Sequence, residues 1–168
     1  MKKVLFTLIS CIFFSSCGEE EQVSNIPTYA VNLMIEPSGI DNHLSIVGNI
    51  GIYVSDKAAY EKLLNDIKGV KVHTAPRLKG EAIGFSGLLL IKTDMELAAF
   101  DLCCPNEIEQ RIKVVPTNES MTAKCPECAS EFNLWENGRA VGGPAEKKRQ
   151  SLKSYRVLPQ NGKFRIVN

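Results

Sequence analysis

Alternation of apolar and other positions is the main pattern of this chain, and it predicts strands. Tyr29, Val31, Leu33 and Ile35 recur at every second position, which is the period of a half-buried strand. Beyond residue 80, further β-type runs are separated by turn residues such as Asp, Asn, Pro and Gly. These runs cover 87–92, 97–102, 112–115, 132–135, 155–158 and 164–167. The pattern therefore predicts a mainly β, antiparallel domain.

One segment has the period of a helix instead. Its apolar residues fall at positions i, i+3, i+4 and i+7, namely Tyr60, Leu63, Leu64 and Ile67. Ser55 precedes the segment as an N-cap candidate, and Gly69 follows it as a stop. We expect one inserted α-helix at about 56–68, with its apolar stripe packed against the sheet.

The N-terminus has the features of an export leader over residues 1–16. Lys2 and Lys3 precede an apolar run that is too short to span a membrane, and Ser15-Ser16 precede Cys17. The Ser-Ser-Cys ending resembles the lipobox of bacterial lipoproteins, which implies lipidation of Cys17 and a membrane partner. An ordinary secretory leader with an incidental cysteine is the alternative.

Residues 17–28 are acidic and polar, which predicts a flexible tether. Gly18-Glu19-Glu20-Glu21 resembles the acidic tether of surface lipoproteins in Bacteroides-like bacteria. This resemblance implies a location in the bacterial cell envelope, anchored by lipid, with the outer membrane as the expected membrane. Residues 29–168 are then a single domain, since the chain without its leader is too short to argue for two.

The charge of the chain argues against nucleic acid as a partner. Its formal net charge is +1, which becomes −1 without the two leader lysines. Apart from Lys147-Lys148-Arg149, no basic stripe is present, and a solvated loop is the first interpretation of that triplet.

Four cysteines beyond the leader lie close together in the sequence, and they are the strongest chemical signal. Cys125-Pro126-Glu127-Cys128 predicts a turn that aims two sulfurs at one point. Adjacent side chains of an extended chain point to opposite faces, so one of Cys103 and Cys104 is the expected ligand. Cys104 is preferred because, like Cys125, it directly precedes a proline. Glu107 stands where a fourth thiolate would lie, and its carboxylate is a candidate ligand. The predicted metal-binding loops are therefore 103–107 and 125–130.

The order of motifs over about residues 85–160 resembles a Rieske domain. The motifs are Gly87 to Leu90, Ala99 to Leu102, Cys104-Pro105-Asn106, Cys125 to Asn133, Gly143-Pro144-Ala145 and Leu152 to Val157. The resemblance implies an antiparallel β-sandwich or barrel whose two loops hold a [2Fe–2S] cluster through two cysteines and two histidines. It also implies that Gly143 and Pro144 cover the cluster and that Ser130 hydrogen-bonds toward a sulfur.

The chain departs from that family at both histidine positions, which are Asn106 and Cys128. A Rieske centre of two cysteines and two histidines is therefore excluded. Three states remain open: a thiolate-rich [2Fe–2S] cluster, one zinc ion, or disulfides with no metal.

Electron transfer with an unidentified redox partner is the leading functional hypothesis, and a structural or binding lipoprotein with zinc or disulfide-fastened loops is the alternative. The two histidines, His43 and His73, lie in polar stretches and are expected to be solvated loop residues. No hydroxyl has a histidine near it in sequence to activate it, so we predict no catalytic site.

Overall fold

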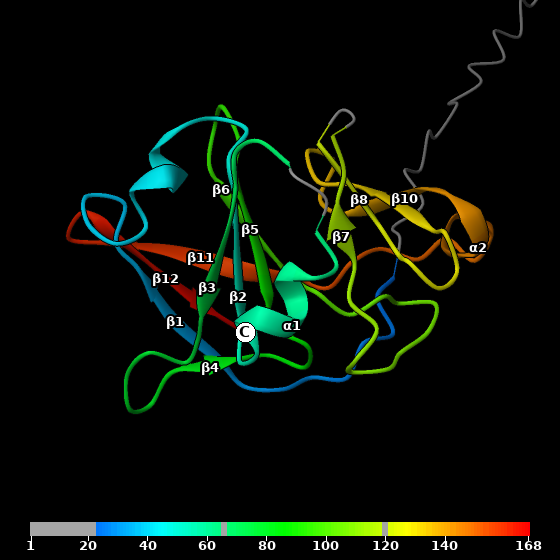
Figure 1. The fold of residues 1–168 in the computed structure, drawn as a ribbon, viewed down its shortest axis with the longest axis horizontal. Coiled ribbons are helices and arrows are strands. Elements are labelled where there is room, and N and C mark those ends of the chain that lie inside the picture. The colour runs from blue at the N-terminus through cyan, green and yellow to red at the C-terminus, as the bar shows by residue number, and fades with distance from the viewer. Residues whose placement is uncertain (1–22, 65–66, 119–120) are drawn as a thin grey trace, which may run out of the picture.

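The computed structural model describes residues 23–64, 67–118 and 121–168, and within them the chain is mainly β. A sheet of eight strands has the order β3-β2-β5-β6-β11-β12-β1-β4, and a sheet of four has the order β10-β9-β8-β7. Figure 1 shows the small sheet and helix α2 at one end of the longest axis, and the β11–β12 turn at the other.

The described helices are short and the strands carry the architecture. The strands are β1 Val31–Ile35, β2 Ile50–Val54, β3 Val70–Thr74, β4 Ala82–Ile83, β5 Leu88–Lys92, β6 Leu97–Asp101, β7 Val115–Pro116, β8 Thr122–Lys124, β9 Glu131–Asn133, β10 Arg139–Gly142, β11 Ser154–Gln160 and β12 Lys163–Val167. The helices are the 3₁₀ turn η1 Asn42–Ser45, α1 Lys57–Glu61 and α2 Gly143–Lys147. In the described part of the chain, no helix is long and apolar enough to cross a membrane.

Strand β5 divides the core into two clusters because it is buried on both faces. Leu88 and Leu90 pack with residues of β1, β6 and β12, inside the curve of the large sheet. Leu89 and Ile91 pack on the other face with Phe100 and with the small sheet. This explains why residues 88–91 form a continuous apolar run without alternation. The second face is where the cysteine loops are held.

The predicted β class is confirmed, and two features of the prediction need correction. The inserted helix is present as α1 but ends at Glu61, well before residue 68, and Asp56 is its cap through a 2.9 Å bond from the Ala59 amide. Leu63 is 43% exposed, so it is not part of a buried stripe. In addition, β2 and β3 pair in parallel through a crossover that contains α1, and all other strand pairs described are antiparallel.

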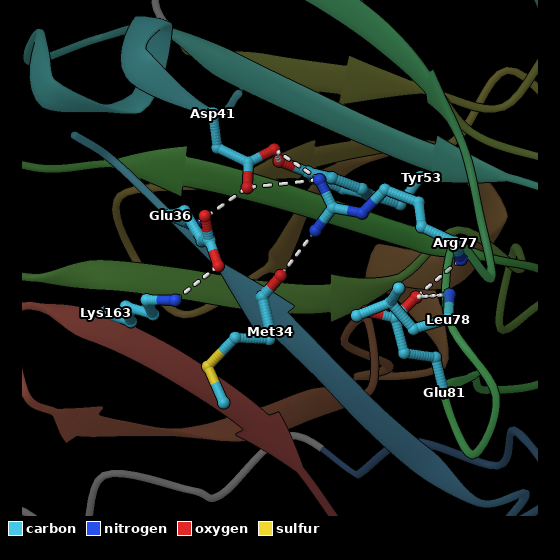
Figure 2. A network of polar contacts seen from close by, with 8 residues as sticks. All are labelled: Met34, Glu36, Asp41, Tyr53, Arg77, Leu78, Glu81 and Lys163. Carbon is cyan, nitrogen blue, oxygen red and sulfur yellow. Dashed lines mark hydrogen bonds and ion pairs between the residues drawn. The ribbon is translucent and has the colours of Figure 1, made fainter. Parts of the chain in front are cut away.

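A buried carboxylate ties the loop before η1 to the large sheet (Figure 2). Asp41 is fully buried and accepts hydrogen bonds from the Tyr53 hydroxyl at 2.8 Å and from Arg77 Nη1 at 3.0 Å. The Arg77 guanidinium also donates to the carbonyl of Met34 in β1. A buried charge requires such pairing, and here the pairing joins four separate segments, those of Asp41, Tyr53, Arg77 and Met34.

The prediction for the two histidines is wrong, because they form a stack in the fold. His73 lies on β3 and is only 8% exposed, with its ring stacked on Tyr53 at 4.8 Å between ring centres. The ring of His43 also stacks on His73, at 5.0 Å between ring centres. Burial is the main cause that lowers the pKa of His73 to about 4, with further lowering by His43, Lys71 and Arg77 against a raising effect of Asp41.

The histidine stack predicts a loss of stability in mild acid. His73 stays neutral in the folded chain, whereas the unfolded chain binds a proton near pH 6.5, so stability is full above that pH and falls as the pH drops toward 4. We expect a loss of about 2 kcal/mol from this group between about pH 7 and about pH 4.5. The measurement is the free energy of unfolding in urea, determined at several pH values between about pH 7 and about pH 4.5.

The matched variant is His73→Phe, which keeps a ring on Tyr53 and removes the proton site. Its stability should depend less on pH than that of the natural chain over the same range. Equal pH dependence of the two proteins would contradict the assignment.

Candidate metal centre

Two loops carry the cysteines, and both are closed by their own backbone hydrogen bonds. The first loop follows β6: the amides of Glu107 and Ile108 donate to the Cys104 carbonyl at 3.2 and 2.9 Å. The second loop joins β8 to β9: the Cys125 amide donates to the Ser130 carbonyl at 2.9 Å, and the Ala129 amide donates to the Cys125 carbonyl at 3.0 Å. These bonds fold each loop into a tight turn around its first cysteine.

The structure brings three of the predicted ligands together. The sulfur atoms of Cys104, Cys125 and Cys128 all lie within 4.8 Å of one another, and Cys104 Sγ is 3.6 Å from Cys128 Sγ. Cys104 and Cys125 are fully buried, and Cys128 is partly exposed. We call these three residues the thiolate group. Its chemistry is that of a soft metal site, because three sulfurs from two loops face one point.

The surroundings of the sulfurs shift the pKa values of Cys104 and Cys125 in opposite directions. The amides of Asn106 and Glu107 face Cys104, and those of Glu127 and Cys128 face Cys125, and each of these bonds lowers the pKa of the cysteine it faces. The interaction between the thiols of Cys104 and Cys125 has the largest effect: it lowers the pKa of Cys125 and raises that of Cys104. Burial raises the pKa of both thiols. Cys125 therefore loses its proton more readily than an ordinary cysteine, and Cys104 then keeps its own.

Ser130 links the thiolate group to α2. Its hydroxyl oxygen accepts a hydrogen bond from the Ala145 amide at 3.0 Å and lies 3.1 Å from Cys128 Sγ. With Cys128 as a thiolate, the hydroxyl proton points to the sulfur and stabilises its charge. Gly143 is needed for this approach, because it has φ +79° and a Cβ there would lie 2.7 Å from the Ser130 Cα. Pro144 is the second residue of α2 and is partly buried.

Cys103 and Glu107 lie outside the thiolate group. Cys103 Sγ faces the carbonyl of Glu109 at 3.7 Å, and burial raises the pKa of this thiol to about 11. The Glu107 carboxylate accepts a hydrogen bond from Asn106 Nδ2 at 2.8 Å. Asn106 in turn accepts a bond from Lys148 Nζ at 2.7 Å. Asn106 therefore joins the first loop to Lys148, the residue after α2.

Sequence reasoning missed two residues that position the first loop. Asp101 is fully buried and accepts hydrogen bonds from the amides of Phe85, Ser86 and Cys103 and from the Tyr155 hydroxyl. Burial raises the pKa of Asp101, and the hydrogen bonds oppose that rise. The second residue is Gln150, whose side-chain amide donates to the Pro105 carbonyl at 3.1 Å. The sequence does contain a signal for Asp101, because an aspartate at the end of an otherwise apolar strand indicates a buried carboxylate with hydrogen-bond partners.

The fold and the site together define a mainly β protein with a three-cysteine group suited to a metal or iron–sulfur centre. Among solved structures, the chain is similar to the ferredoxin of carbazole 1,9a-dioxygenase from Nocardioides aromaticivorans IC177. The identity is 15% and the TM-score 0.36, over 48% of this chain and 74% of that chain. A scan against protein-family models finds no match, and neither does a search of the curated proteins.

We predict that Asp101→Ala destabilises the domain by about 3 kcal/mol, because three amides, two of them buried, and a buried hydroxyl lose their acceptor. Urea unfolding measures the change. Asp94→Ala removes an exposed aspartate of the neighbouring turn and should change stability by less than about 0.5 kcal/mol. A loss at Asp101 no larger than the loss at Asp94 would show that the buried carboxylate does not hold the loop.

Proposed function

We propose that the thiolate group binds a metal centre and that the protein works by electron transfer. The observation that carries the proposal is the convergence of Cys104, Cys125 and Cys128 within 4.8 Å. Three thiolates select soft or borderline metals, among which iron and zinc are the common choices in proteins. Iron supplies a one-electron couple, and the partly exposed Cys128 brings that couple close to the surface, where a partner protein can approach.

The spacing of the sulfurs supports a single four-coordinate ion. Metal–sulfur bonds of about 2.3 Å in a tetrahedron place neighbouring sulfurs roughly 3.8 Å apart. The separation of 3.6 Å between Cys104 Sγ and Cys128 Sγ is close to this value. The fourth position is then available to solvent or to an added ligand, because no fourth protein ligand joins the group among the described residues.

A [2Fe–2S] cluster is the second candidate for the centre. This cluster requires a fourth protein ligand. The Rieske resemblance implies a ligand at position 106, but the Asn106 side chain is hydrogen-bonded to Lys148 and Glu107 instead. What favours the cluster is the hydroxyl of Ser130 beside Cys128 Sγ, the contact that this resemblance implies. To complete the site, Cys103 or Glu107 would have to turn toward the thiolate group.

Zinc defines a second candidate function, in which the centre is structural. The first loop extends from β6 of the large sheet, and the second joins β8 to β9 in the small sheet. A redox-inert ion bound by both loops would therefore cross-link the two sheets. The single-ion spacing of the sulfurs favours this function equally, and only the identity of the metal separates it from electron transfer.

We also propose that the protein is exported and anchored by lipid on Cys17 in the bacterial envelope, with the outer membrane as its site. The leader of residues 1–16 and the Ser-Ser-Cys ending support this, and both lie outside the described residues.

Purification of the full chain without oxygen, followed by metal analysis, sulfide assay and absorption spectroscopy, tests the proposal. One iron per chain, visible absorption that bleaches on reduction and no labile sulfide is the expected result. Two irons with two sulfides would indicate the cluster, and stoichiometric zinc would indicate the structural function. Protein that binds neither metal under these conditions would overturn metal binding.

We predict that Cys104→Ser, Cys125→Ser and Cys128→Ser each lose the metal and lower the unfolding midpoint, because each removes one of three thiolates. Cys103→Ser is the matched control, since its sulfur faces backbone carbonyls, and it should retain the metal. Metal content per chain after gel filtration is the measurement. Equal losses in the Cys103 and Cys104 variants would refute this division of roles.

A further inference from the structure

The chain enters the domain beside the thiolate group. Val23, the first described residue, donates its amide to the Arg149 carbonyl at 3.3 Å and accepts from the Ser151 amide at 3.4 Å. Between them, Gln150 pairs with Val23 in a parallel bridge and donates its side-chain amide to Pro105, directly after Cys104. Val23 is thus joined to the first cysteine loop through a single buried residue.

Further contacts fix the entering segment along its length. Ile26 is buried, with 4% of its surface exposed, and its carbonyl accepts a hydrogen bond from Lys153 Nζ at 3.1 Å. The same ammonium donates to Thr28 Oγ1 at 2.7 Å. The part of the predicted tether that is described therefore lies against residues 149–153, and only residues 17–22 are left to separate Cys17 from the domain.

Covalent geometry limits how far Cys17 lies from this end of the molecule. Six residues span at most about 20 Å when fully extended. A globular domain of this length is roughly 40 Å across. Figure 1 places the small sheet and α2 at one end of the longest axis and the β11–β12 turn at the opposite end. An anchor at Cys17 therefore keeps the end with the thiolate group nearer to the bilayer than the opposite end.

The surface of this end suits a lipid headgroup layer. Lys147 ends α2, and Lys148 and Arg149 follow it; all three are exposed, and Lys148 Nζ also donates one hydrogen bond to Asn106. Lysine and arginine are attracted to the phosphates of anionic lipids. Val23, Ile108 and Val141 are large apolar residues that are 63%, 40% and 37% exposed, and they lie on the segments that adjoin the site. The acidic groups on these same segments are Glu107, Glu109, Glu127 and Glu146; Glu107 is held by Asn106, and Glu109 forms an ion pair with Arg111 at 2.8 Å.

We propose that the domain is held with its thiolate group facing the membrane, and that Lys147, Lys148 and Arg149 contact the phosphate headgroups of the lipid. This orientation rests on the proposed anchor at Cys17. The extended chain between Cys17 and the domain sets the limit: the loop that faces the membrane lies within about 20 Å of the lipid surface. A metal centre held by the thiolate group is farther from that surface by no more than the thickness of this loop. Its electron-transfer partner is then one that lies in or on the same membrane.

Hydrogen–deuterium exchange of the full lipidated chain tests the orientation without adding a reporter cysteine. The chain is compared in detergent and in vesicles of phosphatidylcholine with about one-fifth phosphatidylglycerol, at equal metal content. Vesicles should slow exchange severalfold in peptides that cover 104–111 and 143–150. Exchange at 38–47 and at the β11–β12 turn should not change.

Three variants separate the causes. A flexible insertion of about 15 residues after Gly18 lengthens the tether and should remove most of the protection. Lys147→Glu should reduce it, whereas Lys79→Glu, an exposed lysine of the β3–β4 connection, should not. Protection at the opposite end, or at neither end, overturns the orientation while the anchor stands. A mass spectrum without an acylated Cys17, together with chain that does not float with vesicles, overturns the anchor and the orientation with it.

Discussion

Three sulfur atoms in a largely buried site cannot all carry negative charge unless a cation shares the site. Two unit charges 4 Å apart repel by about 4 kcal/mol even at the effective dielectric constant near a protein surface. The thiolate group has three such pairs, with two of its members buried. The group is therefore either partly protonated, as the opposed pKa shifts of Cys104 and Cys125 describe, or neutralised by a metal. The backbone amides that face Cys104 and Cys125 reduce the cost of negative charge on these sulfurs.

The fold holds the three sulfurs close together because both cysteine loops extend from paired strands. Cys104 follows β6, which is paired on both sides in the large sheet, and Cys125 ends the β8 side of a hairpin. The sulfurs of Cys104 and Cys125 belong to the same buried cluster as Leu89, Phe100 and Phe132. Packing of the two sheets thus sets the distance between the loops, and Asp101 and Gln150 set the path of the first loop within it.

The sequence predicted most of what is local and less of what depends on distant pairing. The strands near 88–92, 97–101, 154–160 and 163–167 were identified because their apolar runs are bounded by turn residues. The parallel pair of β2 and β3 was missed, since pairing across a crossover leaves no signal within either strand. His73 was assigned to a loop because its sequence neighbours are polar, although tertiary contacts with Tyr53 bury it. Similarly, three of the five proposed ligands converge, whereas the Cys103 sulfur faces backbone carbonyls and the Glu107 carboxylate accepts from Asn106, and the sequence alone does not reveal these contacts.

Cys128 and Asn106 have different roles in the two cysteine loops. Cys128 supplies a sulfur to the thiolate group. Asn106 joins Lys148, the residue after α2, to Glu107 in the first loop. The contacts of Asn106 with Lys148 and with Glu107 therefore join the residue after α2 to the first cysteine loop, so the position of this loop depends on α2 as well as on β6.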